Sequence, residues 1–160
     1  MPGMERLRLP FTVSEIYGGF ARVDGLLVVA EKHLEFEYQT SDNVLGAVRG
    51  KIQKRKVRYA DLESVKSKLG WFSCWIEFHA RSLKTFANFP QKDRTAFRIT
   101  VEKKHRTKMN SALSEIELQR SYIEADRLIR KTSKPRRSRK KAEDKESPVQ
   151  TQKLVRPTRQ

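Results

Sequence analysis

Apolar and polar side chains alternate along much of the first 101 residues of this chain. A period of two places alternate side chains on one face of a β-strand, so this pattern predicts strands with one buried face. The clearest run predicts that Phe72, Cys74, Ile76 and Phe78 all point into a core. Further strands are predicted at 20–23, 26–29, 33–38, 51–59, 65–69 and 95–101.

Turn and loop signals separate these strands. Asp24-Gly25 stands between two apolar runs and is typical of a type I′ hairpin turn, because both central positions of that turn need positive φ. Residues 39–50 combine Ser, Asp, Asn and two glycines, which predicts a mobile loop. A second long loop is predicted at 80–93, where three apolar residues indicate that it packs onto the core.

The apolar period changes near residue 103. Met109, Leu113, Ile116 and Ile123 recur at helical spacing and predict one amphipathic helix over about 103–130 whose apolar side faces the strands. This helix is expected to end before Pro135, because the residue preceding a proline disfavours helical backbone angles.

Seven short strands followed by one long helix predict a mainly β domain with one C-terminal α-helix. Three features are distinctive: DGLL at 24–27 leading into LEF at 34–36, VRYADLESV at 57–65, and the closing helix. Together they make residues 17–130 resemble the pleckstrin-homology-like superfold, especially its bacterial and GRAM-like members. The resemblance implies a seven-stranded, partly open barrel that is capped by the helix.

The same resemblance implies a non-catalytic binding module that is recruited to phosphoinositides or to other proteins. Lipid-binding members carry several Lys and Arg around the first hairpin. Here Arg22 is the only base near that predicted hairpin. The resemblance therefore supports a recruitment module, whereas the phosphoinositide signature is largely absent.

Charge divides the chain unevenly. Lys and Arg number 35 against 19 Asp and Glu in 160 residues, which gives a formal net charge of +16. Residues 131–160 hold 11 basic, 3 acidic and 4 apolar residues and no aromatic residue, so their burial cannot offset the entropy of ordering them. The predicted organisation is a loose or edge leader at 1–16, the barrel and helix at 17–130, and a disordered basic tail at 131–160.

On composition, we do not expect a membrane-spanning or a secreted protein. The longest apolar run, Leu26 to Ala30, is too short to span a membrane, and the first ten residues lack the apolar stretch of a secretory signal. The single cysteine, Cys74, makes no internal disulfide or Cys-cluster zinc site and is interpreted as a core residue. These features predict a cytoplasmic protein without a transmembrane segment.

The first candidate site is a basic stretch of the predicted strand at 51–59. Three of its cations alternate on one face, which suits an anion-binding stripe beside the mobile loop. A structural alternative is that this strand pairs antiparallel with the 33–38 strand, which brings its lysines opposite Glu35 and Glu37 as cross-strand ion pairs. The candidate residues are Lys51, Lys54, Lys56 and Arg58.

The second candidate site is six cations within eight residues of the tail. Such a cluster attracts phosphates or anionic headgroups through charge and counterion release, and the lack of aromatic residues argues against base stacking. It equally suits a nuclear-import signal, if the source has a nucleus, or a solubilising tail. The candidate residues are Lys134, Arg136, Arg137, Arg139, Lys140 and Lys141.

No pattern typical of catalysis or metal binding occurs in the sequence. The three histidines, His33, His79 and His105, are isolated and lack metal-ligand spacing. Trp71 follows Gly70 at an expected hairpin tip, where an exposed indole would contact a partner, but both tryptophans are interpreted as cover for the core. We therefore expect no enzymatic activity, no metal and no cofactor.

The sequence as a whole predicts an interaction or recruitment module. The barrel, through the 39–50 loop and the basic strand face, is expected to contact a specific protein or anionic partner. The tail is expected to add non-specific affinity for polyanions. The alternative is a nucleic-acid-associated protein that binds through its basic tail.

Overall fold

In the part of the chain that the structure describes, seven antiparallel strands form one open sheet, and one long helix follows them. The computed structural model describes residues 6–16, 21–42 and 50–133. The sheet order is β4-β3-β2-β1-β7-β6-β5, so the predicted mainly β domain with one C-terminal helix is confirmed. The elements are β1 (Leu7–Ile16), β2 (Ala21–Val29), β3 (His33–Asp42), β4 (Gln53–Arg58), the 3₁₀ turn η2 (Tyr59–Asp61), β5 (Leu62–Leu69), β6 (Cys74–Ala80), β7 (Ala96–Val101), the 3₁₀ turn η3 (Lys103–His105) and α1 (Arg106–Thr132).

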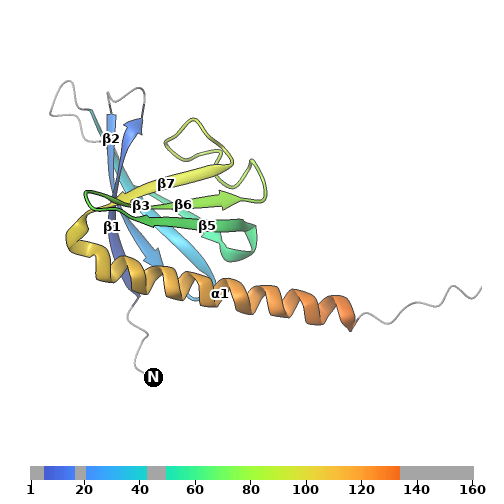
Figure 1. Cartoon of the computed structure of the whole chain (residues 1–160). Coiled ribbons are helices and arrows are strands. Elements are labelled where there is room, and N and C mark those ends of the chain that lie inside the picture. The colour runs from blue at the N-terminus through green and yellow to red at the C-terminus, as the bar shows by residue number, and fades with distance from the viewer. Residues whose placement is uncertain (1–5, 17–20, 43–49, 134–160) are drawn as a thin grey trace, which may run out of the picture.

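The sheet bends strongly, so that β5, β6 and β7 cross over β1 to β4, and α1 runs along one end of the strands (Figure 1). The two edge strands, β4 and β5, follow one another in the chain through η2. Apolar side chains from all seven strands and from α1 meet in one core. This arrangement is compatible with the pleckstrin-homology-like layout.

The expected leader is wrong for residues 7–16, which form a central strand between β2 and β7. Leu9, Phe11 and Val13 belong to the core and are at most 9% exposed. Pro10 lies opposite Leu26 within this strand. A proline usually indicates an edge strand because it donates no backbone hydrogen bond, yet Pro10 lies in a strand that has neighbours on both sides.

The hairpin predicted at Asp24-Gly25 is also wrong. Both residues lie inside β2, which continues unbroken to Val29 and pairs with β1 and β3 along its length. A Cβ atom on Gly25 would lie 2.4 Å from Cζ of the Phe11 ring. The glycine therefore makes room for a core aromatic ring instead of turning the chain.

Aromatic side chains dominate the centre of the core. The rings of Phe36, Phe78 and Phe97 are fully buried. The long segment between β6 and β7 packs onto this cluster through Phe86 and Phe89, which are 1% and 7% exposed, as predicted. The loop thereby adds two rings to the core. Leu83, the third apolar residue of this segment, is instead exposed.

Helix α1 begins and packs as its periodicity predicts. Met109, Ala112 and Ile116 are buried, and Leu113 and Ile123 pack partly buried against the core. The helix runs two residues further than expected, to Thr132, and every residue from 124 to 133 is exposed. Its second half thus extends past the strands (Figure 1). Within the described residues, no helix combines the length and apolar character needed to cross a membrane.

Candidate functional site

The basic face of β4 is paired with carboxylates of β3. The register places Lys54 opposite Glu37 and Lys56 opposite Glu35, which confirms the predicted structural alternative. Lys54 Nζ donates a hydrogen bond to Glu37 Oε1 at 2.6 Å. Lys56 Nζ lies 3.8 Å from Glu35 Oε2. Pairs of opposite charge on neighbouring strands stabilise a sheet. The ammonium groups of both lysines are therefore engaged by carboxylates of the same protein.

These contacts reduce the charge that the β4 face offers to a ligand. The hydrogen bond from Lys54 lowers the pKa of Glu37, and the same bond raises the pKa of Lys54. Arg58 donates from Nε and Nη2 to the two carboxylate oxygens of Asp61 at 2.9 and 3.0 Å. Lys51 is exposed, and none of the ion pairs found within residues 6–16, 21–42 and 50–133 involves it.

The remaining predicted site residues fall largely outside the structure. The tail cluster at 134–141 and loop residues 43–49 lie outside the described residues. The first four residues of the expected 39–50 loop instead extend β3 to Asp42. Across the base of the loop, Gln39 Nε2 donates to the Gly50 carbonyl at 2.7 Å, and the Gly50 amide donates to the Thr40 carbonyl at 2.8 Å.

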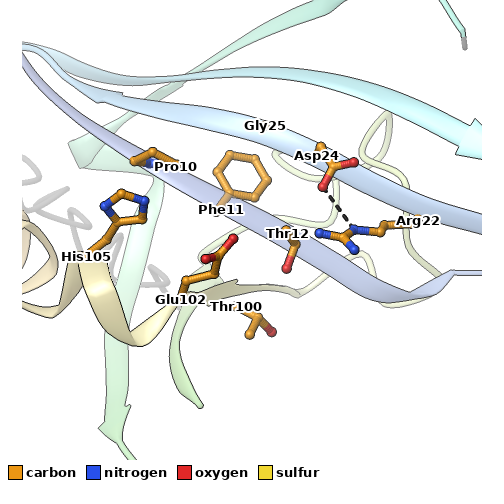
Figure 2. Close-up of a pocket in the computed structure, with 9 residues that line it drawn as sticks. All are labelled: Pro10, Phe11, Thr12, Arg22, Asp24, Gly25, Thr100, Glu102 and His105. Atoms are coloured by element: carbon orange, nitrogen blue, oxygen red, sulfur yellow. Dashed lines mark hydrogen bonds and ion pairs between the residues drawn. The ribbon is translucent and has the colours of Figure 1, made fainter. Parts of the chain in front are cut away.

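A small open pocket of about 150 Å³ lies over β1 and β2 beside η3 (Figure 2). Three of its charged side chains are already engaged, because Arg22 Nε donates to Asp24 at 2.9 Å and Glu102 pairs with Lys104 at 2.7 Å. His105 lines the same pocket. Since the two carboxylates have cationic partners of their own, the pocket offers little binding capacity to a charged ligand.

Metal-ligating residues do not cluster in the described part of the chain. No group of three or more His, Cys, Asp or Glu is placed to hold a metal ion there. His79 Nε2 lies 2.7 Å from Glu77 Oε1, and Cys74 is buried among core residues.

The turn between β5 and β6 exposes two adjacent aromatic side chains. The Gly70 amide donates to the Ser73 carbonyl at 3.0 Å, which places Trp71 and Phe72 at the centre of a four-residue turn. Trp71 is 79% exposed, Phe72 is 92% exposed, and Leu69 at the base of the turn is 41% exposed. We call Leu69, Trp71 and Phe72 the aromatic tip.

Two sequence predictions are wrong at this turn. Trp71 does not cover the core, and Phe72 does not point into it. Phe72 shares its phase with Cys74 and the buried residues after it, but β6 begins only at Cys74, so the turn breaks the alternation. The signal for the turn is Gly70, where a Cβ atom would lie 2.4 Å from the Ser73 carbonyl oxygen.

Lysines surround the aromatic tip. Lys66 and Lys68 are exposed on β5, four and two residues before Gly70. Lys103 Nζ, on η3, lies 5.0 Å from the centre of the Trp71 ring, within range of a cation–π interaction. We call Lys66, Lys68 and Lys103 the flanking lysines.

Glu77 on β6 and Glu102 before η3 are engaged by other bases. Glu77 accepts a hydrogen bond from Arg98 Nε at 2.7 Å and contacts His79 at 2.7 Å. Partial burial acts to raise the pKa of Glu77, but the contacts with Arg98 and His79 hold it below its ordinary value. Arg98 also covers the Trp75 ring at 4.5 Å, so Trp75 is half-buried while Trp71 is not.

Comparison with known proteins found no matching family model, curated protein or solved structure. The fold and the site therefore define only a broad class, a mainly β domain that carries an exposed aromatic hairpin turn among lysines.

Proposed function

We propose that this protein is a non-catalytic, pleckstrin-homology-like recruitment module, in which the barrel makes a specific contact with a protein or anionic partner. The aromatic tip carries the proposal, because two neighbouring rings are 79% and 92% exposed on a hairpin closed by a backbone hydrogen bond. Aromatic side chains are enriched at binding interfaces and supply much of their energy.

The aromatic tip is a better location for the specific contact than the basic face of β4. Lys54, Lys56 and Arg58 already have carboxylate partners within hydrogen-bond or ion-pair distance. A ligand on that face would have to compete with those partners. At the aromatic tip, by contrast, the rings face water and have no internal role in the core.

Photo-crosslinking from the aromatic tip tests this function without assuming the class of partner. The full chain carries Phe72→p-benzoylphenylalanine in cells, and the products are digested with protease, nuclease or lipase to identify what is attached. A matched chain carries the same group at Leu128, which is 59% exposed on α1. We expect a defined adduct from position 72 that position 128 does not give. Identical products from both positions, or none from position 72, would overturn the proposal.

The second candidate function, nucleic-acid association, is favoured by the six cations at 134–141. Replacing all six by Gln should reduce the slope of log K against log salt for duplex DNA by about 5, because each neutralised phosphate contributes about 0.9. Binding is measured by fluorescence anisotropy over a salt series. The control replaces Lys54, Lys56 and Arg58 by Gln and should change the slope far less, since these cations have internal partners.

The tail experiment also separates the two candidate functions. If the tail variant loses DNA affinity but keeps the adduct at position 72, the tail supplies general attraction and the barrel supplies the specific contact. If the variant binds DNA as tightly as the parent at low salt, the tail charge is only solubilising.

A further inference from the structure

We propose that the aromatic tip inserts into the headgroup region of a membrane that contains anionic lipids. This inference rests on the proposed recruitment function and names its partner as a lipid surface. It differs from recognition at the first hairpin, because it uses the β5–β6 turn.

The shape of the turn favours a planar partner. Trp71 and Phe72 occupy its two central positions and are therefore the outermost residues of the hairpin. A protein partner would have to supply a pocket for this convex surface, whereas a bilayer accepts a projecting apolar group without a preformed pocket. The indole of Trp71 suits the boundary between headgroups and acyl chains, where tryptophan is enriched.

The apolar rings and the lysines lie in the same order as the acyl chains and the anionic headgroups of a bilayer. The aromatic rings lie at the end of the hairpin, while Lys66 and Lys68 lie behind them on β5 and Lys103 lies beside them on η3. Insertion of the rings would therefore bring the lysine ammonium groups to the level of the headgroups. Lysines that flank an apolar insertion in this way attract anionic lipids.

Repulsion from neighbouring carboxylates is small, because those carboxylates have other partners. Glu77 lies opposite Lys66 in the sheet but is bound by Arg98 and His79. Glu102, which precedes η3, is paired with Lys104 at 2.7 Å. No ion pair among those found in the described ranges engages the flanking lysines, so their charge is available to a ligand.

The test uses the intrinsic fluorescence of Trp71 in the full chain. Trp71 and Trp75 are the two tryptophans, so a Trp75→Phe background reports Trp71 alone. We expect its emission to shift to shorter wavelength with phosphatidylcholine vesicles that contain about 30% phosphatidylserine, because anionic lipid attracts the flanking lysines. Brominated acyl chains should then quench it. Heparin, a polyanion without an apolar layer, should cause neither change.

Vesicle co-sedimentation with otherwise native chains measures the contribution of the rings. The double variant Trp71→Ala/Phe72→Ala should bind the acidic vesicles at least about tenfold more weakly, since it loses the apolar area that inserts. Each flanking lysine replaced by Gln should weaken binding about fivefold. The matched control, Leu128→Ala/Ile129→Ala, removes two adjacent side chains that are 59% and 64% exposed on α1 and should bind as the parent does.

The possible results separate this inference from the function on which it rests. If Trp71 emission is unchanged by acidic vesicles, or if the double variant binds them as tightly as the parent, insertion is wrong. A protein adduct from position 72 in that case keeps the recruitment function and assigns the aromatic tip to a protein partner. Loss of both the vesicle response and the adduct would overturn both proposals.

Discussion

Replacing Phe36 with alanine should lower the free energy of unfolding by about 3–5 kcal/mol, a large share of the roughly 5–15 kcal/mol available to a domain of this size. Phe36 is fully buried on β3. Its ring has four phenylalanine neighbours with centroid distances between 5.4 and 6.2 Å, all in edge-to-face geometry. The substitution removes these contacts and leaves a cavity where β1, β6, β7 and the β6–β7 loop meet.

Chemical denaturation followed by circular dichroism measures this loss. The matched control is Phe72→Ala, which removes the same side chain from a position that is 92% exposed and should change stability by less than about 0.5 kcal/mol. If Phe36→Ala does not fold, Phe36→Leu should fold with a loss of about 1–2 kcal/mol. Equal losses for positions 36 and 72 would contradict the arrangement of the core.

The expected strand number was correct, although two of its elements were misassigned. β1 was taken for a loose or edge leader, and β2 was divided at Asp24-Gly25 because that dipeptide usually turns the chain. The second error has its physical source in a contact between distant segments. Phe11 on β1 needs space above Gly25 on β2, and a contact between residues so far apart in sequence leaves no local signal.

The helix and the basic strand were predicted more accurately. The signal for the helix is local, and the contacts of the basic strand follow from its pairing with the preceding strand. The spacing of Met109 and Ile116 needs no distant partner to indicate a buried helix face. The pairing of Lys54 with Glu37 follows once the strands before and after the 39–50 loop are placed side by side. The hairpin tip at Trp71 was expected, but Phe72 was assigned to the core because its phase continues that of β6, although the chain turns between them.

The position of the aromatic tip relative to α1 bears on how the two proposed contacts would act together. The β5–β6 turn lies beside η3, where α1 begins, since Lys103 contacts Trp71. The basic tail follows the other end of α1, which at 27 residues is about 40 Å long. An attraction through the tail would therefore raise the local concentration of the domain near an anionic partner without occupying the aromatic tip.

Replacing Ile116 with aspartate should destabilise the protein by about 4 kcal/mol or more, because it places an unpaired carboxylate in an apolar core. Ile116 is fully buried and lies in the half of α1 that contacts β1 and η2. The buried residues Met109 and Ala112 share its face of the helix. The loss should appear as a lower midpoint in chemical denaturation, together with exposure of the core to a hydrophobic dye.

The matched control is Ile129→Asp, the same substitution on the same helix at a position that is 64% exposed. It should change stability by less than about 0.5 kcal/mol, because every residue of α1 after Ile123 is exposed. Ile116→Val, which keeps the position apolar, should cost only about 0.5–1.5 kcal/mol and shows whether charge or volume causes the larger loss. Comparable losses from aspartate at 116 and 129 would mean that the second half of the helix is also packed, and a stable Ile116→Asp protein would remove α1 from the core.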